Sequence, residues 1–373
     1  MSLRKTISYL LFPLTCWYAV GVAVRNILYE TGIKKQHAPH ITTIGVGNLS
    51  TGGSGKTPHV EYLLDMLSGN YRTAVLSRGY KRKSKGFQLD DGSHDAARLG
   101  DESAMIAAKY PQVQVAVCEK RIEGVRRLME LHADTPSSES DNGQKDNQAP
   151  ELIILDDVFQ HRRIKPSINI LLTEYRQPFY SDYILPYGDL REFRSARRRA
   201  SIVVVTKCPA KLNPVERHNI VQALHLQCYQ KVFFSYLAYG PLRPLNGTAR
   251  TLDLRRTDCV LAVTGIAHPG PMIEELRRNC KVQHMAFADH HNYTSCDMAR
   301  IRETFDSMSG HRKAIVTTEK DAMRLQGKCD DLPVYIQPVA VKFHQDKDIN
   351  FDQIVESAVR ENISFLSNLK SWT

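Results

Sequence analysis

The sequence predicts an α/β protein: a doubly wound sheet joined by an extended ribbon to a second, smaller α/β domain. Two stretches of alternating apolar strands and amphipathic helices favour this class, because such alternation is typical of parallel sheets covered on both faces. A glycine-rich loop between the first predicted strand and helix points the same way. At 373 residues, the chain has the length of two domains rather than one.

Composition and charge exclude several classes of protein. With 42% hydrophobic and 24% charged residues, the chain is not disordered, collagen-like or a polytopic membrane protein. Its net charge of +10 favours an anionic partner, which can be a nucleic acid, a phosphorylated molecule or an acidic bilayer. The eight cysteines contain no C-x-x-C pair, so we expect reduced thiols in the cytoplasm and neither zinc nor disulfides.

Residues 7–24 (ISYLLFPLTCWYAVGVAV) form an uncharged apolar stretch between Lys5 and Arg25. The stretch is short for a spanning helix, which needs about 20 residues, and Pro13 interrupts it. We therefore expect residues 1–28 to form an apolar helix that associates with an anionic membrane surface, in a peripheral or monotopic way. A buried helix, a signal peptide and a true span stay open as alternatives.

The first alternating stretch predicts a larger domain over residues 29–231. Strands are expected at residues 40–46, 73–76, 113–117, 152–155, 168–172 and 202–206, and helices at 59–67, 101–109 and 121–131. Within this domain, residues 135–150 (TPSSESDNGQKDNQAP) are polar and free of aromatics, which predicts a flexible insertion.

The second alternating stretch predicts the smaller domain over residues 246–333. Strands are expected at residues 260–263, 282–287 and 314–317, and helices at 271–278, 296–305 and 321–325. Residues 232–239 and 334–343 alternate as extended strands, and we expect them to pair as a ribbon within linkers at 232–245 and 334–345. Residues 346–373 should form a C-terminal helix or tail.

The strongest local signal is residues 47–57 (GNLSTGGSGKT), between the first predicted strand and helix. In such a loop, glycines let backbone N–H groups turn towards a phosphate, while the lysine reaches the β- and γ-phosphates and the threonine hydroxyl binds Mg²⁺. Ser50 stands where the usual motif has its first glycine, so the loop is a variant. The sequence thus predicts a P-loop NTPase-like fold. The residues expected to contact ATP are Gly52, Gly53, Ser54, Gly55, Lys56 and Thr57.

An acidic pair, Asp156 and Asp157, ends the apolar strand of LIILDDVFQ. In nucleotide-binding sheets, a carboxylate at the carboxyl end of a strand next to the P-loop strand holds the metal or its water. We therefore expect a Mg²⁺ site at Thr57, Asp156 and Asp157, and the sequence does not separate the roles of the two aspartates.

Other polar residues follow further predicted strands, at the edge where α/β sheets bind ligands. Each one alone is more often a helix cap or a solvated loop residue. They include Arg78 and Tyr80 in SRGY, Asp101 and Glu102 in GDE, His161 after the acidic pair, and His290 in FADHH. A basic run beside Glu192 favours contact with a phosphate or an anionic headgroup; it comprises Arg191, Arg194, Arg197, Arg198 and Arg199.

In their order and spacing, these motifs resemble the tetraacyldisaccharide 4′-kinases, which phosphorylate the lipid A precursor of Gram-negative bacteria. The resemblance runs from about residue 5 to about residue 345. It rests on GNLSTGGSGKTP, SRGY, GDE, LDDVFQHRR, LREF with RRA, TGIAHP, FADHH and TTEKDAMRL. Two features depart from the family pattern: Val158 replaces the usual glycine of DDGFQH, and the insertion at residues 135–150 is longer than typical.

The resemblance implies ATP- and Mg²⁺-dependent transfer of the γ-phosphoryl group to the 4′-hydroxyl of a tetraacyldisaccharide 1-phosphate in lipid A biosynthesis. It implies work at the cytoplasmic face of the bacterial inner membrane. It further implies that Asp101 is the catalytic base and that His290 partners it. The other residues that match family site positions are Lys56, Thr57, Asp156, Asp157, Tyr80, Arg191 and Glu192.

Other function classes fit the sequence less well. A membrane-associated P-loop ATPase switch of the MinD/ParA type has a signature lysine where this chain has Thr51. A nucleic-acid-binding protein would leave the P-loop and the acidic pair unexplained, and a soluble small-molecule kinase has no use for residues 7–24. We expect a monomer with no nucleic-acid partner.

Overall fold

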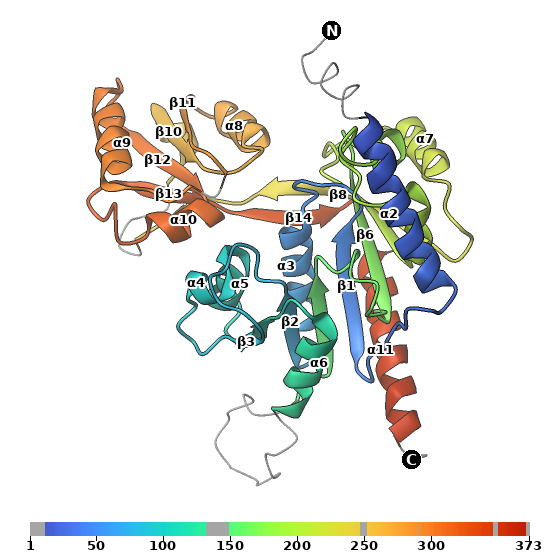
Figure 1. The fold of residues 1–373 in the computed structure, drawn as a ribbon. Helices are drawn as coiled ribbons and strands as arrows, with labels where there is room; N and C mark the ends of the chain where they lie inside the picture. The colour runs from blue at the N-terminus through green and yellow to red at the C-terminus, as the bar shows by residue number, and fades with distance from the viewer. Residues whose placement is uncertain (1–11, 132–148, 247–251, 290, 346–349, 371–373) are drawn as a thin grey trace. The chain divides into compact units, whose positions relative to one another are not determined.

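The computed structural model describes residues 12–131, 149–246, 252–289, 291–345 and 350–370 (Figure 1). The chain divides into two compact units, one of residues 1–236 with 341–373 and one of residues 237–340. Almost all of the expected insertion at residues 135–150 lies outside the described part.

The larger unit is built on a nine-stranded sheet in the order β14-β8-β7-β6-β1-β5-β2-β4-β3. Its strands are β1 (Thr42–Asn48), β2 (Thr73–Ser77), β3 (Gln88–Leu89), β4 (Gln114–Val117), β5 (Leu152–Asp156), β6 (Ile168–Glu174), β7 (Ile202–Thr206), β8 (Lys231–Tyr239) and β14 (Val339–Phe343). Strand β1 lies between β5 and β6, parallel to both, with Val46 opposite Asp156. Every residue of β1, β2, β5 and β7 is buried, as expected for the centre of a parallel sheet.

Helices cover both faces of this sheet, so the doubly wound prediction is confirmed. Alternate residues of β5 enter different apolar clusters, Leu152 and Ile154 in one and Ile153 and Leu155 in the other, because successive strand side chains point to opposite faces. The first face packs against α3 (Lys56–Leu67), α5 (Asp101–Lys109) and α11 (Phe351–Lys370), and the second against α6 (Arg121–Glu130) and α7 (Pro214–Leu224). Short helical segments are α4 (Ala96–Leu99), η2 (Phe179–Ser181) and η3 (Arg194–Arg199).

The smaller unit has a five-stranded sheet in the order β11-β10-β12-β13-β9. Its elements are β9 (Arg243–Pro244), η4 (Leu254–Arg256), β10 (Cys259–Thr264), α8 (Gly270–Arg277), β11 (Lys281–Ala286), α9 (Ser295–Ser307), β12 (Lys313–Thr318), α10 (Glu319–Leu325) and β13 (Val334–Gln337). Helix α8 packs in one apolar cluster of this unit, and α9 and α10 pack in the other.

The predicted ribbon is present but shorter than expected. Strands β8 and β14 are neighbours in the larger sheet, whereas residues 334–337 form β13 of the smaller sheet. Pro338, which has no backbone N–H, separates β13 from β14. Phe233 and Phe234 of β8 are buried in the larger unit. The segments predicted as linkers therefore contain strands that belong to both sheets.

The first described helix, α2, runs from Phe12 to Glu30, so its end lies beyond the predicted residue 28. Pro13 lies in the described part of this helix, and the helix continues without a break through the residues that follow it. Thr15 and Val22 are buried against the larger unit, and the opposite face is apolar and exposed. Among the helices of the described ranges, none is long and apolar enough to cross a membrane.

Two glycines in β1 let the loop of residues 157–160 lie directly against the strand. A Cβ atom on Gly45 would come within 2.7 Å of Val158 Cγ1, and one on Gly47 within 2.6 Å of Phe159 Cβ. The turn's positive φ, +46°, falls on Asp157. Val158, in place of the family's glycine, instead buries its side chain in the core. The family departure therefore leaves the acidic turn intact.

We expect Gly47→Ala to lower the free energy of unfolding by about 1–3 kcal/mol, since the new methyl group overlaps the backbone of Phe159 and forces the loop away. Denaturant unfolding measures the change. Gly69→Ala is the matched control, because no atom lies within 4 Å of its added Cβ. Equal stability of the two variants would contradict the close approach.

Candidate active site

The glycine-rich loop begins where β1 ends, at Asn48, and closes where α3 begins, at Lys56. Gly52 and Gly55 have φ values of +102° and +84°, which side chains other than hydrogen rarely allow. The Ser54 carbonyl accepts a bond from Thr206 Oγ1 at 2.9 Å. These contacts hold the loop's carbonyl oxygen towards the protein, which is the orientation that a phosphate-binding loop requires.

His59, one turn into α3, braces the same loop and was not singled out by the sequence motifs. Its Nδ1 lies 2.7 Å from the Gly55 carbonyl oxygen, and its Nε2 lies 2.9 Å from Ser235 Oγ in β8. Burial lowers the pKa of His59 to about 4, so the ring is neutral at pH 7. A neutral imidazole can donate its Nδ1–H to the Gly55 carbonyl oxygen and accept the Ser235 hydroxyl hydrogen at Nε2.

Two cationic side chains converge on Asp157. Lys56 Nζ lies 3.6 Å from Asp157 Oδ1, and Arg191 Nη2 lies 3.2 Å from the same oxygen. Both cations also contact the Asn48 side chain, Lys56 at 3.4 Å and Arg191 through its Nη2. Burial raises the pKa of Asp157, but the charges of Lys56 and Arg191 outweigh it and hold the pKa below its usual value. Asp157 is therefore ionised and already paired.

Asp156 is in the opposite electrostatic situation. It is fully buried at the end of β5, and this burial, with the nearby charges of Glu102 and Asp157, raises its pKa to about 6. Arg121 does not pair with the carboxylate: its Nη2 donates to the Asp156 backbone carbonyl at 2.8 Å. Within the described ranges, Asp156 Oδ1 has no hydrogen-bond partner. This oxygen is therefore suited to a cation from outside the chain.

The donors present fit Mg²⁺ bound together with a nucleotide. Thr57 is buried at the start of α3, next to the loop, and offers a hydroxyl oxygen. No group of three or more His, Cys, Asp or Glu side chains that could hold a metal occurs among the described residues. Mg²⁺ is usually bound by one or two carboxylates together with phosphate oxygens and waters. A site at Thr57 and Asp156 would therefore take phosphate oxygens and waters as its remaining ligands.

The predicted polar loops adjoin this centre. A Cβ atom on Gly100 would come within 2.8 Å of the Tyr80 carbonyl oxygen, so the SRGY loop packs on the start of α5, where Asp101 and Glu102 lie. Glu102 is near enough to Asp156 to raise its pKa. Tyr80 itself is exposed, and Lys81 Nζ lies 5.6 Å from its ring centroid.

Three other predicted residues have different surroundings. Burial, and then the charges of Arg121 and Arg78, lower the pKa of His161 to about 4, so it is neutral at pH 7. Glu192 is buried and accepts a bond from Arg199 Nη2 at 2.7 Å. This contact joins the loop at Glu192 to η3. His290 lies outside the described residues, so its pairing with Asp101 stays a prediction.

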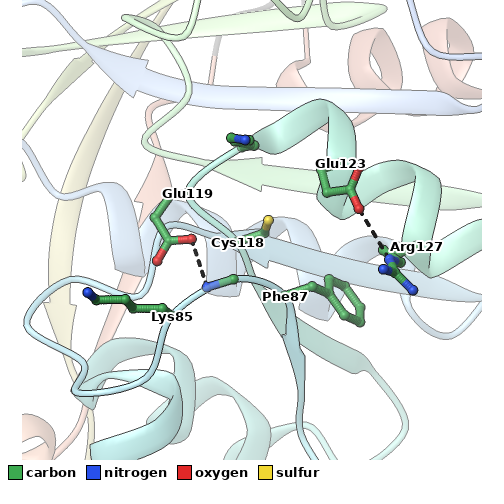
Figure 2. Close-up of a pocket in the computed structure, with 8 residues that line it drawn as sticks. Lys85, Phe87, Cys118, Glu119, Glu123 and Arg127 are labelled. Atoms are coloured by element: carbon green, nitrogen blue, oxygen red, sulfur yellow. Dashed lines mark hydrogen bonds and ion pairs between the residues drawn. The ribbon is translucent and has the colours of Figure 1, made fainter.

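A pocket of about 980 Å³ opens at the carboxyl end of β4, two strands away from β5 (Figure 2). Its acidic side chains already have partners: Glu119 accepts the Gly86 N–H, and Glu123 pairs with Arg127. The lining includes Phe87 but none of the predicted site residues. We therefore place the chemistry at the glycine-rich loop and not in this pocket.

Comparison with known proteins agrees with this geometry. The model of the tetraacyldisaccharide-1-P 4′-kinase (LpxK) family matches residues 7–360. The chain belongs to this family. A tetraacyldisaccharide 4′-kinase of Bacteroides fragilis (strain YCH46) is 39% identical over 365 residues, which is 94% of this chain and 93% of the relative. One of Flavobacterium johnsoniae is 38% identical over 358 residues, covering 95% and 98% of the two chains.

A solved LpxK structure has the same fold. The LpxK of Aquifex aeolicus, crystallised in complex with ATP, is 29% identical, has a TM-score of 0.71, and is matched over 95% of this chain and 99% of its own. The predicted family and the P-loop NTPase-like fold are confirmed. The comparisons support a kinase of the LpxK family and give no support to a MinD/ParA-type switch.

The opposite pKa shifts of the two aspartates predict opposite effects of neutralising them in the protein without metal or nucleotide. Asp156→Asn should raise the free energy of unfolding at pH 8 by on the order of 3 kcal/mol, because a pKa raised from 3.8 to about 6 means that ionisation opposes folding. The gain should shrink as the pH falls through 6 and vanish below about pH 4. Denaturant unfolding with a chelator present measures it.

Asp157→Asn is the matched control for this prediction. Its lowered pKa means that its charge stabilises the fold above the ordinary carboxyl pKa, so its neutralisation should destabilise the protein at pH 8. A change of the same sign in both variants would contradict the assignment of distinct environments.

Proposed function

We propose that this chain transfers the γ-phosphoryl group of ATP to the 4′-hydroxyl of a tetraacyldisaccharide 1-phosphate in lipid A biosynthesis. The observation that carries the proposal is the glycine-rich loop with Lys56 beside the acidic pair, in a chain whose family match covers residues 7–360. The motifs at Asp101, Arg78 and Tyr80 adjoin this centre.

The residues around the phosphates take separate roles in this proposal. The loop backbone at residues 52–55 and the Lys56 ammonium bind the β- and γ-phosphates. Thr57 and Asp156 hold Mg²⁺, which neutralises charge on the transferring phosphoryl group when it is bound. Asp157, already paired with Lys56 and Arg191, positions these two cations. The buried, unpartnered oxygen of Asp156 supports this division.

Asp101 is our candidate for the catalytic base. It is the first residue of α5, next to the SRGY loop, which packs on Gly100. A sugar hydroxyl is a weak nucleophile at neutral pH, and a carboxylate within hydrogen-bond reach orients it and accepts its proton. We retain His290 as the group that orients Asp101 or passes the proton on.

The acceptor lipid explains the exposed face of α2. Trp17 is 78% exposed, and Val20, Val24 and Ile27 lie on the same side of the helix, each at least half exposed. An apolar helix face of this kind is typical of proteins that lie in the membrane interface, where a tetraacylated acceptor stays in its leaflet. We propose that α2 binds the cytoplasmic face of the inner membrane, in a monomer.

The test is phosphoryl transfer from γ-labelled ATP to a detergent-dispersed disaccharide 1-phosphate lipid. Lys56→Ala and Asp101→Ala should each lower kcat/KM by about 10²-fold or more, because one removes phosphate binding and the other the base. Asp306→Ala, an exposed aspartate of α9, is the control and should keep wild-type activity.

One result would contradict the proposed activity, and another would contradict only the role of Asp101. ATP hydrolysis without a labelled lipid would indicate an ATPase switch. Full transfer activity of Asp101→Ala would keep the kinase but remove the proposed base.

A further inference from the structure

Two motifs of the smaller unit, TGIAHP and TTEKDAMRL, meet at one buried carboxylate. Asp321, the third residue of α10, is fully buried. Its Oδ2 accepts the Gly265 N–H at 2.9 Å and the Thr318 hydroxyl at 2.7 Å. Its Oδ1 lies 3.5 Å from Arg324 Nη1. Burying a carboxylate is unfavourable unless it is paired and hydrogen-bonded, and these contacts meet both conditions.

Asp321 lies at the switch point of the smaller sheet. From β10 the chain passes through α8 to β11 on one side of β10, and then through α9 to β12 on the other side, with both strands parallel to β10. In sheets of this kind, the loops after the two strands that meet at the switch point usually part and leave a crevice for a ligand. Here the carboxylate of Asp321, after β12, binds the N–H of Gly265, after β10. Asp321 therefore holds these two loops together.

The loop after β11 packs on the same place. A Cβ atom on Gly265 would come within 2.9 Å of Asp321 Oδ1, 3.2 Å of the Ala288 carbonyl oxygen and 3.3 Å of Tyr293 Oη. Tyr293 is buried, and its burial, with the negative charge of Asp321, raises its pKa. Ala288 and Tyr293 precede and follow His290 in the sequence. Both ends of the segment that contains His290 therefore lie against Gly265.

A second aspartate holds the same loop and shows what is unusual about Asp321. Asp297, the third residue of α9, closes the capping box of its helix and lies 2.9 Å from His291 Nε2. Asp321 has the same position in α10, but it accepts a backbone N–H from Gly265 in another loop. A helix cap alone would need only local contacts. The reach of Asp321 to Gly265 therefore serves the loops rather than the helix.

We propose that Asp321 is a positioning residue for the phosphoryl transfer: it fixes the loops after β10 and β11 and, with them, the segment that contains His290. The proposal rests on the proposed function, in which His290 orients Asp101 or passes its proton on. Groups that act in a reaction must be held in their productive geometry by neighbours whose own side chains are locked. A fully buried carboxylate bonded to two loops is such a neighbour.

The test is a double-mutant cycle on phosphoryl transfer by the full chain, with Asp321→Asn and His290→Ala. Asp321→Asn alone should lower kcat by about tenfold or more and change the KM for ATP by less than about twofold, because the phosphate loop belongs to the larger unit. In the His290→Ala background, Asp321→Asn should cause no further loss, because a residue that acts through His290 then has nothing to position. Asp253→Asn, at the cap of η4 in the same unit, is the control and should keep wild-type activity.

The possible results separate this proposal from the proposed function. Equal losses from Asp321→Asn with and without His290 would show a general effect on folding and overturn the proposal. A wild-type kcat in either single variant overturns it as well. No transfer by the wild type overturns the proposed function instead.

A second variant applies if circular dichroism shows that Asp321→Asn does not fold. Gly265→Ala leaves the carboxylate in place, but its methyl group would lie 2.9 Å from Asp321 Oδ1 and force the two loops apart. Its loss of kcat should also disappear in the His290→Ala background. Additive losses in this cycle would overturn the proposal.

Discussion

The site depends on an imbalance of charge at the point where β1 and β5 end side by side. Lys56 and Arg191 both pair with Asp157, and Asp156 next to it is buried with a raised pKa. Burying a carboxylate without a cation opposes folding, so the ligand-free chain stores an unfavourable interaction here. A divalent cation bound beside Asp156 together with phosphate would offset this cost.

The backbone itself brings the glycine-rich loop and the acidic pair together. The parallel register of β1 and β5 brings the glycine-rich loop and the acidic pair to one edge. Gly45 and Gly47 then allow residues 157–160 to lie against β1. The chain turns from β5 into this loop at Asp157, which has a positive φ. The same loop also contacts α2, because the Gln160 carbonyl accepts a bond from Arg25 of that helix.

Local signals were sufficient for much of this structure. The apolar strands, the glycine-rich loop and the adjacency of β1 and β5 could be predicted, because continuous apolar runs and a P-loop depend on neighbouring residues. The pairing of β8 with β14 was only partly predicted, since strand register across some hundred residues is set by tertiary packing and Pro338 divides the second strand. The different environments of Asp156 and Asp157 could not be predicted, because the sequence shows two adjacent aspartates but neither their burial nor their partners. The contacts of Asn48 and His59 were missed for the same reason.

The proposed function makes two demands on the chain: phosphate must bind beside the buried Asp156, and the acceptor lipid must reach it without leaving its leaflet. Both meet in the segment from residue 182 to Arg191, in which Tyr187 contacts α2 and the Arg191 side chain reaches Asp157. The most direct test follows the γ-phosphorus of ATP by ³¹P NMR in vesicles that contain the disaccharide 1-phosphate. The account predicts one new lipid phosphomonoester for each ATP consumed. Release of inorganic phosphate at the same rate with and without acceptor would contradict it.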